Sequence, residues 1–281
     1  PYGDVWLLLK PLAYKVHPYQ WNTIGKEISH IENATMEDVK DFFKRFYHPA
    51  NAIMVVAGAI DLENVKSWSE KWFGTIPAQL KNNRNLPVEP TQTAPRRLVV
   101  HKDVPANSIY KAWHICKRTD KSYHHFDLIS DILSNGKSSR LYLHLVKDKK
   151  LFTEINAYVS GDMDNGLFIV SGKLTAATNV DDAEKEIDKA VYQFVHEKLE
   201  ENELQKVKNK VESVLNFSNT NVLNKAMNLA YYELLGDADL LNKEEENYAA
   251  ITADDIQQTA KNYFTEANSV TLHYLMNEVK A

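Results

Sequence analysis

The chain has 281 residues, of which 44% are hydrophobic, and it carries a formal net charge of −5 at pH 7. This length fits one large or two ordinary domains, and this composition excludes a disordered chain. The lysines are scattered among acidic residues, which disfavours a nucleic-acid partner, and no apolar run reaches the roughly 20 residues of a membrane span.

The first part of the chain is predicted to be mainly helical. Helices are predicted over residues 3–16, 36–47 and 62–73, an ordered loop over 17–25 and a strand over 52–57. Pro11 should bend the first helix, and Asp61 should cap the third. Residues 78–95 are rich in Gln, Asn, Arg and Pro without apolar periodicity, so they are predicted to be a linker.

The rest of the chain combines strands with long helices. Strands are predicted over residues 97–104, 108–117, 152–159, 166–174 and 269–275, and helices over 123–133, 138–147, 181–199, 201–217, 223–235 and 254–264. The strands over 152–159 and 166–174 should pair as a hairpin around a turn at 161–164. The single cysteine, Cys116, excludes an internal disulfide and is expected to be a buried strand thiol. Strands in two clusters without regular alternation with helices predict an α+β fold with mainly antiparallel sheets.

One pattern occurs twice, 217 positions apart. Thr35 and Asp38 correspond to Thr252 and Asp255, and in both copies an amphipathic helix and an apolar strand follow. Further matches are Lys44 with Lys261, Ala50 with Ala267 and Asn51 with Asn268. The repeat predicts an internal duplication, and the shorter lead-in of the first copy predicts that about 120 residues are missing before it.

The duplication predicts three regions: the C-terminal part of a first unit over residues 1–77, the linker over 78–95, and a complete second unit over 96–281.

No metal-ligating or catalytic residue is predicted from motifs. His196 and Glu197 begin like the zinc motif H-E-x-x-H, but Glu200 stands where the second histidine is required. His124 and His125 lack a third ligand nearby in the sequence, so both are expected to be surface histidines. The chain also lacks the G-x-S-x-G motif of a serine nucleophile.

Three segments resemble the insulinase/pitrilysin family of zinc metallopeptidases: HPYQWNTIG at 17–25, ENATMEDVKDFFKRFYHPANAIMVVAGAID at 32–61, and NGKSSRL at 135–141. The resemblance spans essentially the whole chain and implies tandem insulinase-type α/β units, the first of them truncated. In this family an inverted H-x-x-E-H motif and a later glutamate hold zinc. The resemblance places that motif upstream, so it implies zinc in the full-length protein and none bound to this chain.

The resemblance also suggests two substrate-binding residues. The family's Arg, and its Tyr seven residues later, fall on Lys147 and Glu154 when the sequences are aligned on Arg140. Lysine keeps the positive charge but loses the planar fork of arginine, and a glutamate would repel a developing oxyanion. Alternatively, both are ordinary exposed charges on a helix end and a strand face.

The resemblance implies that the chain is the C-terminal portion of a metalloendopeptidase that hydrolyses oligopeptides inside a chamber, and that it is inactive alone. The implied partners are peptide substrates and, in a homo- or heterodimer, another insulinase-type chain. A bacterial protein of the periplasm or cytoplasm is implied. Two alternatives remain open: a non-catalytic homologue that acts as a partner subunit, and a peptide-binding scaffold that uses strand addition at a sheet edge.

Overall fold

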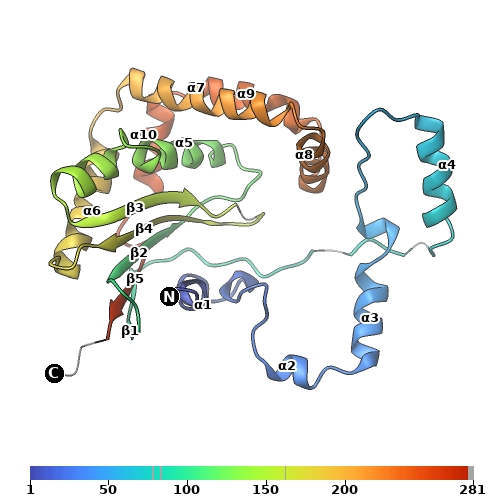
Figure 1. Ribbon diagram of the computed structural model, residues 1–281, viewed down its shortest axis with the longest axis horizontal. Coiled ribbons are helices and arrows are strands. Elements are labelled where there is room, and N and C mark those ends of the chain that lie inside the picture. The colour runs from blue at the N-terminus through green and yellow to red at the C-terminus, as the bar shows by residue number, and fades with distance from the viewer. Residues whose placement is uncertain (78, 83, 162, 278–281) are drawn as a thin grey trace. The chain divides into compact units, whose positions relative to one another are not determined.

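A computed structural model describes residues 1–77, 79–82, 84–161 and 163–277 (Figure 1). By their internal contacts, residues group into two units that are each built from separated segments. The first unit comprises Pro1–Thr23, Pro87–Lys210 and Asn247–Ala281, and the second comprises Ile24–Leu86 and Val211–Glu246. The three regions expected from the duplication follow chain order instead, and their boundaries stay a prediction.

The first unit contains a five-stranded sheet in the order β1-β5-β2-β4-β3. The strands are β1 (Arg96–Lys102), β2 (Ser108–His114), β3 (Phe152–Val159), β4 (Leu167–Leu174) and β5 (Ser269–Met276). β1 pairs with β5 in parallel, whereas the other three pairs are antiparallel. The predicted α+β fold with a mainly antiparallel sheet is therefore confirmed, as is the β3–β4 hairpin, although its turn includes residue 162, outside the described residues.

The last strand completes this sheet by entering its middle. β1 and β2 follow one another across a short turn, yet β5 lies between them and pairs with both. The second copy of the repeated pattern therefore ends on a strand, β5, that is hydrogen-bonded to a neighbouring strand on each side.

Helix α1 (Val5–Ala13) covers one face of the sheet, with Pro11 inside the helix. Leu9 of α1 belongs to the same buried cluster as Leu272 and Tyr274 of β5. Because successive strand residues point to opposite faces, Thr271 and His273 face the other side, toward α6 (Val180–His196). One face of β5 is thus apolar and the other is polar.

The remaining elements of the first unit are helical. They are α5 (Tyr123–Ser134), the π-helix η3 (Tyr142–Asp148), α10 (Ala253–Tyr263), the 3-10 turn η1 (Pro18–Gln20) and the first part of α7 (Glu201–Ser218). At the end of α5, the Ser134 hydroxyl donates to the Ala157 carbonyl at 2.9 Å and accepts from the Ala157 N–H at 2.7 Å. Since β3 is an edge strand, this hydroxyl blocks strand addition at that point.

The later residues of the predicted linker are anchored to the first unit. The Glu89 carboxylate accepts hydrogen bonds of 2.8 Å from the backbone N–H groups of Lys15, Val16 and His17. Burial opposes the charge of Glu89, but these three donors outweigh burial and lower its pKa. Gln92 is buried and donates to the carbonyls of Ala267 and Ser269. Residues 78 and 83 of the linker lie outside the described residues.

The second unit contains short and long helices. They are α2 (Ser29–Glu32), α3 (Met36–Phe46), the 3-10 turn η2 (Pro49–Asn51), α4 (Leu62–Phe73), the end of α7, α8 (Val222–Leu235) and most of α9 (Leu240–Ala250). Asp61 accepts from the Asn64 N–H and caps α4 as predicted. No residue of α3 or α4, both fully described, is buried.

The strand predicted over residues 52–57 is wrong for this structure. The chain there is irregular from Ala52 to Ile60. A strand requires a neighbouring strand to satisfy its backbone groups, and the described part of the second unit provides none. The helix predicted over 138–147 begins later and is a π-helix, and α9 was not predicted as a separate helix.

Candidate functional site

Helix α6 places one carboxylate against the polar face of the sheet. The helix begins at an Asn179 cap, and its buried face includes Ala183, Glu184 and Ile187. Glu184 is only 7% exposed. An ionised carboxylate is stable at such a position only when charges and hydrogen-bond donors surround it.

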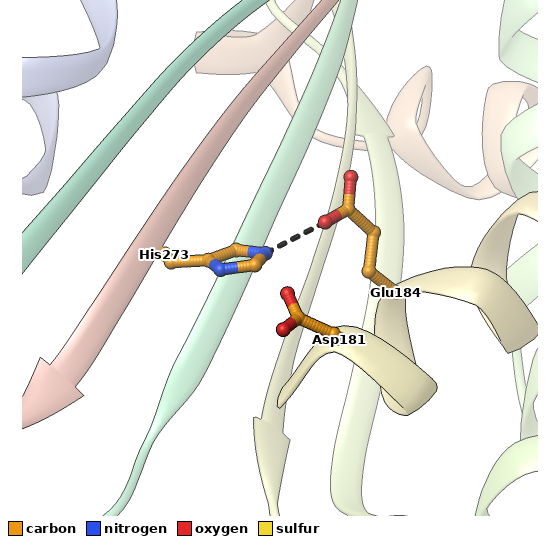
Figure 2. Close-up of side chains that lie close together, drawn as sticks. All are labelled: Asp181, Glu184 and His273. Carbon is orange, nitrogen blue, oxygen red and sulfur yellow. Dashed lines mark hydrogen bonds and ion pairs between the residues drawn. The ribbon is translucent and has the colours of Figure 1, made fainter. Parts of the chain in front are cut away.

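Three strands supply those groups. His273 of β5 donates from Nε2 to Oε2 of Glu184 at 2.7 Å (Figure 2), and the Thr271 hydroxyl donates to Oε1 at 3.2 Å. Lys111 of β2 lies 3.2 Å from Oε1, and Arg97 of β1 forms an ion pair with Oε2. Glu184 therefore ties α6 to β1, β2 and β5.

Two further acids, Asp181 and Asp188, lie at the exposed side of this cluster. The Arg97 guanidinium lies 3.6 Å from Asp181, and Lys111 also forms an ion pair with Asp188. Three acids thus share two cations, and both cations are in contact with Glu184.

His273 is neutral in this environment. Burial first, and then the positive charges of Arg97 and Lys111, lower its pKa to about 4, although Asp181 acts in the opposite direction. A neutral imidazole can donate one hydrogen bond to Glu184 and keeps its other ring nitrogen as an acceptor.

Asp181, Glu184 and His273 form a group whose ligand atoms lie within 4.8 Å of one another (Figure 2). Their chemistry nevertheless does not fit a zinc ion. Glu184 already binds two cationic side chains, so a dication would be placed beside Arg97 and Lys111 and repelled by both. The arrangement is better described as an ion-pair network that joins α6 to the sheet.

The two substrate-binding candidates lie on adjacent elements of the first unit. Lys147 is exposed near the end of η3, and Glu154 is exposed on β3, where it pairs with Lys173 at 2.8 Å. Within the described part of the chain, no hydrogen bond or ion pair joins Lys147 to Glu154. Their role in binding peptides stays a prediction.

The histidines considered for metal binding have structural contacts. His124, expected at the surface, is buried, and its ring lies 4.8 Å from that of Tyr248. His125 Nδ1 lies 2.7 Å from the Thr259 hydroxyl of α10. The expectation of a surface position was wrong for His124 because the Tyr248 ring packs against it.

Cys116 is buried, and burial raises its pKa to about 12, which disfavours a reactive thiolate. The expected buried thiol is confirmed, although Cys116 lies just beyond the end of β2.

Comparison with known proteins identifies the family to which the chain belongs. The family described as the peptidase M16 inactive domain matches residues 33–211, which is more than half of the chain. The chain belongs to this family. The resemblance to zinc metallopeptidases of the insulinase type, on which the expected fold depends, is thereby confirmed.

Individual relatives agree with this assignment. The chain is 27% identical over 285 residues to the zinc protease PqqE of Helicobacter pylori, a match that covers 97% of this chain and 62% of the relative. A crystal structure of a protease from Helicobacter pylori has a TM-score of 0.88 at 25% identity, covering 98% of this chain and 67% of that one. The peptidase M16 inactive domain from Pseudomonas fluorescens has a TM-score of 0.83 at 16% identity, covering 98% and 65%.

The chain therefore spans just over three fifths of the length of the PqqE relative. None of the helices in the described part is long and apolar enough to cross a membrane.

Proposed function

We propose that the chain is the C-terminal portion of a zinc-dependent metalloendopeptidase that hydrolyses oligopeptides. In this proposal it supplies chamber wall and peptide-binding surface but no zinc ligand. The main support is the match of residues 33–211 to an inactive domain, together with longer relatives that are named zinc proteases.

The second unit supports the proposal through its exposed apolar side chains. Val39, Phe42 and Phe43 of α3 are each more than half exposed. At the equivalent positions of the second copy, 217 residues later, Ile256, Thr259 and Ala260 of α10 are all buried. We infer that in the longer protein α3 covers a sheet, in which residues 52–57 take the place that β5 has in the first unit.

Lys147 and Glu154 are proposed to contact peptide in the assembled protein. Both are exposed, and the two elements that carry them, η3 and β3, pack together. The Glu154–Lys173 ion pair would have to open for Glu154 to bind a peptide directly.

The test compares the 281-residue chain with a longer protein that also includes a region equivalent to the part of the PqqE relative that this chain does not cover. Hydrolysis of an internally quenched peptide is measured with and without a zinc chelator. We expect chelator-sensitive hydrolysis by the longer protein and none by the chain alone. Chelator-sensitive hydrolysis by the chain alone would refute the proposal.

A partner-subunit role is the second candidate, and the departures at Lys147 and Glu154 from the family's Arg and Tyr favour it. It predicts that the longer protein is inactive alone and activates another M16 chain. A longer protein that lacks H-x-x-E-H would support this role, whereas activity without a second chain would exclude it.

A further inference from the structure

The first unit contains a cavity of about 540 Å³ between α6, the sheet and the segment that joins α10 to β5. This volume lies within the range of small-molecule pockets. Its inner wall is apolar, because Trp113, Val191 and Val195 are all buried there. The ring of Phe264 lies 5.2 Å from that of Trp113 and extends this wall.

The outer rim of the cavity is aromatic. Tyr192 of α6 lines the cavity and is 63% exposed. The His196 ring stacks on it at 4.0 Å with an interplanar angle of 23°. The pair therefore presents an aromatic surface next to an apolar wall.

The cations that line the cavity are already occupied. Arg97 and Lys111 both bind Glu184, and the Arg96 guanidinium donates to the Leu12 and Ala13 carbonyls at the end of α1. An anionic ligand would therefore find no free cation among these three.

The acids that line the cavity are less fully occupied. The Glu266 carboxylate makes no hydrogen bond or ion pair with any described residue. Asp188 is half exposed, and Lys111 contacts only its Oδ1 oxygen. Negative charge at the rim is thus available to a ligand.

We propose that this cavity binds an organic cation with an aromatic or apolar body. The cationic group lies near Glu266, and the body packs against Trp113 and Tyr192, where the ring faces also attract the positive charge. A free amine and the basic residue of a peptide share this chemistry. Only the peptide source depends on the proposed function.

Isothermal titration calorimetry of the full 281-residue chain tests the proposal with three probes that share one ring: phenethylammonium, phenethyl alcohol and phenylacetate. We expect phenethylammonium to bind at least about tenfold more tightly than the other two, and less tightly as salt is added. Equal binding of the three probes, or no binding, would overturn the proposal. An end-capped Phe-Arg dipeptide then separates the sources, because it binds only if the cavity accepts a peptide.

Two variants locate the site. Glu266→Gln removes a charge without a structural partner, and Tyr192→Ala removes the exposed ring, so each should weaken phenethylammonium binding by about fivefold. The matched controls are Glu246→Gln and Tyr47→Ala, both exposed in the second unit, with Tyr47 also 63% exposed. Unchanged affinity in both Glu266→Gln and Tyr192→Ala would contradict the assignment. Hydrolysis is not measured, so a negative result leaves the proposed peptidase role untouched.

Discussion

Glu184 shows how one buried carboxylate can organise a helix and three strands. Its two oxygens contact Arg97, Lys111, Thr271 and His273, which come from β1, β2 and β5. A buried ion pair adds little net stability over well-packed apolar residues. Removal of one partner, however, leaves the other charge buried and uncompensated, which is strongly destabilising. The network therefore fixes the position of α6 on the sheet.

The pKa of His273 makes this network sensitive to acid. Its folded-state pKa of about 4 lies below the ordinary 6.5, so between these values the unfolded chain binds a proton that the folded chain does not. The contribution of His273 to stability is fully present above pH 6.5 and is lost as the pH falls toward 4. We expect the free energy of unfolding to fall by about 1–2 kcal/mol from this residue between pH 7 and pH 5.

The measurement is chemical denaturation at a series of pH values, with His273→Gln as the comparison. Glutamine can still donate to Glu184 but does not titrate, so the variant should lose stability less steeply over this range. Acidic groups such as Glu89, whose pKa is lowered, change the free energy of unfolding with pH equally in both proteins. Identical slopes in the two proteins would exclude His273 as the titrating group.

At the scale of elements, local signals were sufficient for most helices. Thr35 and Thr252 each form a capping box with the aspartate three residues later, and both hydroxyls lie 2.6 Å from that carboxylate. These contacts depend on four consecutive residues, so the sequence alone predicts them. The predicted strand over 52–57 failed because a strand depends on partners from elsewhere in the chain.

The two copies of the repeat allow a controlled test of burial. Ile256 in α10 is fully buried, whereas its counterpart Val39 in α3 is 56% exposed. We expect Ile256→Ala to lower the free energy of unfolding by about 3 kcal/mol and Val39→Ala to change it by less than about 0.5 kcal/mol. Denaturation of both variants of the 281-residue chain decides the matter. Comparable losses would mean that α3 is packed in solution.

At the scale of the whole molecule, the ion-pair network could not be predicted from the sequence. Arg97, Lys111, Glu184 and His273 are separated by up to 176 positions, and no local spacing connects them. Their proximity results from the entry of β5 between β1 and β2 and from the packing of α6 on that face. By contrast, the resemblance to the insulinase/pitrilysin family depended on short segments such as residues 17–25, which can be recognised without knowledge of the fold.

The exposed apolar faces of α3 and α4 lead to a prediction about association. Phe42, Phe43, Trp68 and Trp72 are each more than half exposed, and surfaces of this kind promote self-association of a soluble chain. We expect the 281-residue chain to form concentration-dependent oligomers in sedimentation velocity experiments. Phe43→Glu should shift the distribution toward the monomer, because burial of a carboxylate in an apolar contact is costly.

Lys44→Glu is the matched control, since it also adds a carboxylate to α3 but at a position that is already charged. If the apolar face drives association, only Phe43→Glu should reduce it. Lys44→Glu changes the net charge by two units and Phe43→Glu by one, so an effect of Lys44→Glu as large as or larger than that of Phe43→Glu would mean that net charge controls association instead. If α3 covers a sheet in the longer protein, as proposed above, that protein should not form concentration-dependent oligomers through this face, with or without either substitution.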